Sequence, residues 1–180
     1  MSGRATDPRR LDVTALAAAE SSLDGQWPLS SFTRLPQAHA QTGDVDWSLQ
    51  STLRRSATSA AEPWLALTVS TRARLACQRC LQDFDVPLQV AADFRFVANE
   101  ALAAALDADA EEDVLPLPQR LDLHELVEDE LLLALPLVPM HEVCPQPLRG
   151  VDPVAGALGG TDDEPGRTHP FAALQLLKRS

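Results

Sequence analysis

Apolar and polar residues alternate strictly along two neighbouring stretches in the middle of the chain. Over residues 65–77 the apolar side chains occupy odd positions, and over residues 84–96 they occupy even positions. A period of two is typical of β-strands with one buried face and one solvated face. The same pattern begins upstream with Trp47, Leu49 and Leu53. We therefore predict an antiparallel β-meander over residues 45–97.

Pro87 falls on the outward face of the last predicted strand. A proline has no N–H group to donate to a neighbouring strand, so prolines occur at sheet edges or at bulges. We predict that this strand is a sheet edge at Pro87 or carries a bulge there.

The clearest helix is predicted between Asp122 and Pro136. Asp122 is a good N-cap, and Glu125 three residues later completes the pattern of a capping box. Pro136 ends the helix, because the residue before a proline avoids the α conformation. An apolar stripe is formed by Leu123, Leu126, Val127, Leu131 and Leu135, and Glu125, Glu128 and Asp129 are expected on the opposite face.

The remaining segments give weaker patterns. An alanine-rich helix is predicted over residues 13–23, capped by Asp12 and stopped by Gly25. Residues 26–43 are predicted to form a loop with one helical turn, 99–113 an acidic solvated loop or frayed helix, and 114–118 a short edge strand.

Together these elements predict an α+β fold, in which an antiparallel β-meander carries a few packed helices. We expect residues 1–143 to form a single domain. Proline and glycine become frequent after this point, so residues 144–180 are predicted to be a flexible tail. Its end is apolar again at Phe171, Leu174 and Leu177, which predicts a short helix that docks on the protein's own sheet or on a partner, or a frayed terminus.

Charge narrows the classes of partner. The 180-residue chain has a net charge of −11, with +2 in residues 1–80 and −13 in residues 81–180. An acidic surface repels phosphate backbones and favours a basic partner. No apolar run approaches the roughly 20 residues that a membrane span needs, and the N-terminal residues do not resemble a secretory signal. Three cysteines are too few for the disulfide scaffold of a secreted protein. We expect a cytoplasmic protein that does not act at a membrane.

The cysteines carry the best local signal for chemistry. Cys77 and Cys80 form a C-x-x-C motif in a predicted hairpin turn, and His141 and Cys144 form an H-x-x-C motif. Two such motifs can close a tetrahedral Cys₃His zinc site. The alternative is a set of small residues in tight loops. A thioredoxin-like redox role is less favoured, because that motif is followed by a helix and here a strand follows.

No catalytic motif is complete. Residues 26–149 contain only Gly43, which excludes a glycine-rich phosphate loop there, and His124 has no second histidine at metal-ligand spacing. We expect no enzyme and no small-molecule substrate. The candidate partner-binding residues are a local basic strip, an acidic helix face and the apolar end of the tail: Arg72, Arg74 and Arg79; Glu125, Glu128 and Asp129; and Phe171 and Leu174.

Three motifs resemble the YceD family, the large ribosomal RNA subunit accumulation proteins of bacteria. Residues 75–81 are similar to its C-x-R-C-L segment, and residues 127–141 to its ED-E-(I/L)-LALP-(L/V)-VP-x-H signature. Residues 169–178 are similar to its terminal NPFA-x-L-x-x-LK, with His169 in place of the commoner Asn. Some relatives carry a second C-x-x-C where this chain has His141 and Cys144.

The resemblance implies a cytosolic, non-enzymatic protein needed for accumulation or processing of large-subunit ribosomal RNA. It implies no established cofactor. Its partner would be a precursor of the large ribosomal subunit, contacted through a basic ribosomal protein or through a local RNA contact. The alternative from the residues alone is a zinc- or thiol-dependent regulatory protein that uses Cys77, Cys80, His141 and Cys144.

Overall fold

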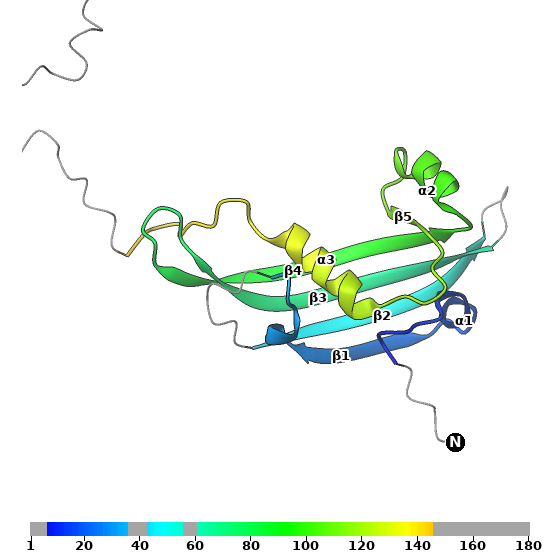
Figure 1. Ribbon diagram of the computed structural model, residues 1–180, viewed down its shortest axis with the longest axis horizontal. Coiled ribbons are helices and arrows are strands. Elements are labelled where there is room, and N and C mark those ends of the chain that lie inside the picture. The colour runs from blue at the N-terminus through cyan, green and yellow to red at the C-terminus, as the bar shows by residue number, and fades with distance from the viewer. Residues whose placement is uncertain (1–6, 36–42, 56–60, 146–180) are drawn as a thin grey trace, which may run out of the picture. The chain divides into compact units, whose positions relative to one another are not determined.

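A single five-stranded sheet organises the protein in the computed structural model, which describes residues 7–35, 43–55 and 61–145 (Figure 1). Neighbours in the chain are neighbours in the sheet, in the order β1-β2-β3-β4-β5, and every pairing is antiparallel except that of β4 with β5. The strands are β1 (Ser22–Pro28), β2 (Asp44–Arg55), β3 (Ala61–Ala76), β4 (Asp83–Val97) and β5 (Asp113–Pro116).

One helix crosses a face of this sheet and closes the core. It is α3 (Leu123–Ala134), which lies over the middle strands in Figure 1. The remaining helices are α1 (Val13–Ala18), the single 3₁₀ turn η1 (Leu29–Ser31) and α2 (Glu100–Asp107). The buried stripe of α3 is Leu123, Val127 and Leu131, which packs with sheet residues such as Leu67, Phe94 and Phe96. The predicted α+β fold is confirmed.

The predicted alternation is confirmed residue by residue. Odd positions of β3 and even positions of β4 face the core, and the register places Leu67 opposite Ala92. The other face is mainly polar, and two of its side chains, Ser48 and Thr68, share a hydrogen bond of 2.7 Å across β2 and β3. A sheet covered on one side accounts for the strict period of two in the sequence.

Pro87 lies at a sheet edge, as predicted. β5 pairs with β4 only along Phe94–Val97, so the earlier part of β4, including Pro87, has a strand neighbour on the β3 side alone among the described residues. The missing N–H therefore leaves the ladder with β3 uninterrupted.

The predicted helix over residues 13–23 is wrong beyond Ala18. Asp12 caps it as expected by accepting a hydrogen bond from the Ala15 N–H, but the chain then turns at Glu20, whose φ is 46°, and enters β1. Gly25 is therefore not a helix stop but the middle of an edge strand. It faces Trp47, and a Cβ at this position would lie 2.6 Å from the indole ring. The prediction that Gly25 stops a helix was wrong because glycine is needed here to leave room for the Trp47 ring.

The acidic segment over residues 99–113, which was predicted to be a solvated loop or a frayed helix, contains regular secondary structure. Residues 100–107 form α2, whose cap Asn99 accepts a hydrogen bond from the Leu102 N–H, so the frayed-helix alternative was closer. The predicted edge strand is confirmed as β5, but it runs parallel to β4 rather than continuing the antiparallel meander. The helical turn predicted within residues 26–43 is η1.

The folded part extends past the predicted boundary at residue 143. Cys144 is buried and packs against Cys77 and Cys80. Residues 146–180, with the predicted apolar end at Phe171 and Leu174, lie outside the described residues.

Replacing Gly25 by alanine should lower the free energy of unfolding by about 1–3 kcal/mol, because the new methyl group overlaps a buried indole ring. Denaturant unfolding measures this loss. Asp24→Ala, at an exposed position of the same strand, is the matched control and should change stability by less than about 0.5 kcal/mol. Equal stability of Gly25→Ala and Asp24→Ala would contradict the packing of β1.

A Cys/His cluster as the candidate metal centre

The turn between β3 and β4 holds the first pair of cysteines. The Cys77 N–H donates to the Gln82 carbonyl at 2.9 Å, and the Leu81 N–H donates to the Cys77 carbonyl at 2.8 Å. Leu81 adopts a φ of 61°, a conformation that L-residues rarely take. These bonds close a tight turn that keeps both thiols on the same side of the hairpin end.

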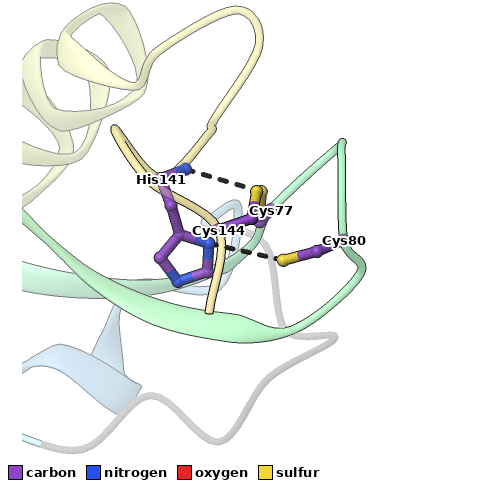
Figure 2. Close-up of side chains that lie close together, drawn as sticks. All are labelled: Cys77, Cys80, His141 and Cys144. Carbon is purple, nitrogen blue, oxygen red and sulfur yellow. Dashed lines mark hydrogen bonds between the residues drawn. The ribbon is translucent and has the colours of Figure 1, made fainter. Parts of the chain in front are cut away.

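A returning segment brings the second pair to this turn. After α3 the chain runs back to the hairpin, where the Gln78 N–H donates to the Pro139 carbonyl at 2.8 Å. The His141 N–H then donates to Cys77 Sγ at 3.4 Å. Figure 2 shows the result, with His141 and Cys144 lying against the two cysteines of the turn.

The four side chains form one compact group. One ligand atom from each of Cys77, Cys80, His141 and Cys144 lies within 4.8 Å of all the others. Cys77 Sγ is 3.8 Å from Cys144 Sγ, and Cys80 Sγ is 3.4 Å from His141 Nδ1. All three cysteines are buried and free of disulfides. The predicted grouping of the two motifs is therefore present, and its residue types could hold a metal ion.

The local environment makes the thiol of Cys77 more acidic than that of Cys144. Burial pushes the pKa of Cys77 upward, but hydrogen bonds from the backbone N–H groups of His141, Cys80 and Arg79 outweigh it and lower the pKa to about 5. Burial raises the pKa of Cys144 to about 11, and its bonds to Cys80 and Cys77 add to the rise. Cys77 is therefore the more acidic of these two thiols.

Aromatic packing orients the histidine. The imidazole of His141 lies 4.4 Å from the ring of Phe84, between ring centroids, at the start of β4. This contact and the hydrogen bond between His141 Nδ1 and Cys80 Sγ fix the ring so that Nδ1 faces the sulfurs. Phe84 is thus part of the candidate metal centre. Its place in the alternating sequence pattern had predicted only that it would face the core.

Comparisons with known proteins show which family the chain belongs to. The family described as "Large ribosomal RNA subunit accumulation protein YceD" matches residues 65–178, which include the cluster and α3. The chain belongs to the YceD family. A protein of Haemophilus influenzae named "Large ribosomal RNA subunit accumulation protein YceD" is 35% identical over 105 residues, 58% of this chain and 59% of that protein. No solved structure matches significantly. The described residues contain no helix long and apolar enough to cross a membrane.

The predicted basic strip of this YceD family member is partly neutralised. Arg74 lies 3.1 Å from Asp85 and 3.8 Å from Asp83, nitrogen to oxygen. Arg72 is exposed on the polar face of the sheet, and Arg79 is exposed in the cysteine turn rather than on that face. The three arginines therefore do not form one continuous positive surface.

The predicted acidic face of α3 is wrong for Glu128, which is buried. Its two carboxylate oxygens accept bonds from the Arg34 backbone N–H, at 2.6 Å, and from Arg34 Nε, at 3.0 Å. Burial raises the pKa of Glu128, but these bonds and the charge of Arg34 outweigh it and leave the pKa below its ordinary value. Asp129 pairs with the same guanidinium, and Glu125 is exposed. Two of the three candidate partner residues are thus engaged within the domain.

A second polar group was missed by sequence analysis. The ring of His124 stacks on Phe32 with centroids 4.3 Å apart, and its Nε2 lies 2.9 Å from Ser31 Oγ. Burial lowers the pKa of His124, with a smaller contribution from Arg9. The group joins α3 to η1, and Ser31, His124 and Arg34 line one surface hollow.

Replacing Glu128 by glutamine should lower the free energy of unfolding by about 1–3 kcal/mol, because a charged acceptor of two bonds to Arg34 is lost. Chemical unfolding at neutral pH measures this. The difference from the native chain should shrink as the pH falls below 4.5, where the native carboxylate also takes up a proton. Glu125→Gln, at an exposed site one turn earlier, is the control. Equal effects of the two variants would contradict the buried pair.

Proposed function

We propose that this protein supports the accumulation of large-subunit ribosomal RNA as an assembly factor in the cytoplasm, acting by binding rather than by catalysis. The observation that carries the proposal is the family match over residues 65–178. That range spans nearly all of the long β3–β4 hairpin, the Cys/His cluster and α3. The described part of the matched range therefore contains the hairpin, the helix that packs on it and the cluster at the hairpin end.

Three buried polar groups near α3 and the hairpin turn have structural roles. Glu128 is satisfied by Arg34, and His124 by Ser31, so these two sites are built to join α3 to the N-terminal segment. Cys77 is held by backbone N–H groups inside the cluster. These groups stabilise the fold, and none needs a substrate to complete its hydrogen bonds.

The partner in this proposal is a precursor of the large ribosomal subunit, reached through a basic ribosomal protein or a local RNA contact. The net charge of −11 favours the protein contact, because an acidic surface attracts cationic chains and repels RNA phosphates. Arg72 and Arg79 are exposed and remain the described candidates for a local RNA contact.

A specific observation favours a second property, zinc binding by Cys77, Cys80, His141 and Cys144. Tetrahedral zinc with sulfur ligands at about 2.3 Å separates two sulfurs by about 3.8 Å. Cys77 and Cys144 are 3.8 Å apart, and the shorter sulfur–nitrogen distance at Cys80 and His141 follows the same geometry. We propose that zinc here is structural and clamps the segment after α3 to the hairpin turn. A regulatory role for zinc or for the thiols is the alternative.

Deleting the gene should reduce mature large subunits and leave precursors of these particles, because the proposal places the protein in their assembly. Sucrose-gradient profiles of ribosomal particles measure this. The purified protein should also co-sediment with such precursors at low salt and be released as salt rises, as expected for charge-driven association. Normal profiles together with no co-sedimentation would overturn the proposed function.

Purified protein should contain about one zinc per chain, and a chelator should lower the melting temperature, because metal binding is coupled to folding. Elemental analysis and thermal unfolding measure the two effects. His141→Ala should lose zinc and the response to chelator, and Glu142→Ala, at the exposed neighbouring position, should keep both. Zinc content far below one per chain, with a melting temperature that a chelator does not change, would exclude the zinc site.

A further inference from the structure

Two thiols from distant parts of the chain lie side by side inside the Cys/His cluster. Cys77 follows β3 in the hairpin turn, and Cys144 belongs to the segment that returns after α3 (Figure 2). Their sulfur atoms are 3.8 Å apart, and the sulfur–sulfur bond of a disulfide is about 2.0 Å long. The two sulfurs therefore have to approach by about 1.8 Å to bond.

The other contacts of the turn cysteines favour Cys77 as the partner of Cys144. Cys144 contacts both of them. Cys80 Sγ lies 3.4 Å from His141 Nδ1, and the ring of Phe84 holds that imidazole in place. A bond between Cys77 and Cys144 leaves this contact as it is, whereas a bond between Cys80 and Cys144 would disturb it. The His141 N–H also donates to Cys77 Sγ at 3.4 Å, which keeps the returning segment beside Cys77.

A small oxidant meets Cys144 first, because Cys144 is 9% exposed and Cys77 is 0% exposed. A peroxide converts the Cys144 thiol into a sulfenic acid, and its O–O bond breaks with release of one water. The sulfur of Cys77 then attacks the sulfenic sulfur, the S–O bond breaks, and the hydroxyl leaves as a second water with the proton of Cys77. In total the two thiols lose two electrons and two protons, and hydrogen peroxide is reduced to two waters.

We propose that oxidation by a peroxide joins Cys77 and Cys144 in a reversible disulfide. This deepens the thiol-dependent alternative given above, and it rests on the proposed zinc site for one consequence, the release of metal. The disulfide consumes two of the four ligands, and Cys80 and His141 alone do not complete a tetrahedral zinc site. The cluster is thereby a switch between a reduced form that binds metal and an oxidised form that does not.

The disulfide keeps the returning segment attached to the hairpin turn after the metal has left. It closes a loop of the chain that contains β4, α2, β5 and α3. A cross-link of this kind lowers the entropy of the unfolded chain. In the presence of a chelator, the oxidised protein should therefore melt at a higher temperature than the reduced protein. Dithiothreitol should abolish the difference.

The test treats the full-length purified protein with hydrogen peroxide and maps the product by mass spectrometry without reduction. Trypsin cuts after Arg79, so the three cysteines fall, in chain order, on three separate peptides: 75–79, 80–95 and 121–149. The peptide of Cys77 should be linked to the peptide of Cys144. The number of free thiols per chain should fall from three to one, because two are consumed, and dithiothreitol should restore them. A chromogenic zinc dye should report release of metal as the disulfide forms.

Cys80→Ser is the matched control, because it removes the cysteine that the proposed bond does not use. This variant should lose zinc and still form the link between Cys77 and Cys144. In the native protein, a bond between Cys77 and Cys80, or between Cys80 and Cys144, would overturn the proposal. So would disulfides between chains on a non-reducing gel, or three free thiols that survive the peroxide.

Metal content separates this proposal from the proposed zinc site. If the purified protein holds no zinc and peroxide still links Cys77 to Cys144, the disulfide stands and the zinc site is wrong. If the protein holds zinc and peroxide neither releases the metal nor forms the link, the zinc site stands and the disulfide is wrong. The role in ribosome assembly is decided separately, by the gradient profiles.

Discussion

The pairing of β3 with β4 is the constraint on which the rest of the structure depends. Thirteen residue pairs, from Trp64 with Arg95 to Ala76 with Asp83, fix the register of this hairpin. A slip of one residue would turn every buried side chain of one strand to solvent. The same register places Cys77 and Cys80 at the hairpin end and builds the apolar face on which α3 packs. The cluster and the helix thus follow from one set of backbone contacts.

Much of this arrangement could be predicted because its causes are local. The period of two over residues 65–96 depends only on which side chains face the core, and the cap at Asp122 depends on residues a single turn away. The C-x-x-C and H-x-x-C motifs predicted a possible common site because two such motifs can supply the four ligands of a tetrahedral zinc ion, although small residues in tight loops remained the alternative. The C-x-x-C motif lies between the stretch with apolar residues at odd positions and the stretch with apolar residues at even positions. Its place in the turn between two strands could therefore also be predicted.

What escaped prediction depends on contacts between distant parts of the chain. Glu128 looked like a solvent-exposed charge on a helix, and only its pairing with Arg34, 94 residues earlier, makes its burial favourable. Gly25 resembled a helix stop because the ring it accommodates, that of Trp47, belongs to another strand. The parallel pairing of β5 is likewise set by the return of the chain through α2. None of these partners is marked in the local sequence.

The open edge of β4 has a consequence for the behaviour of the protein in a crowded cell. Along most of its length this strand has a neighbour on one side only among the described residues, and an uncovered edge is a template on which strands of other molecules can add. Pro87 interrupts the row of donors that such an intruding strand would need, and Asp83 and Asp85 place negative charges along the same stretch. The edge is thereby a poor seed for fibrous aggregation, even though half-buried apolar side chains lie directly behind it.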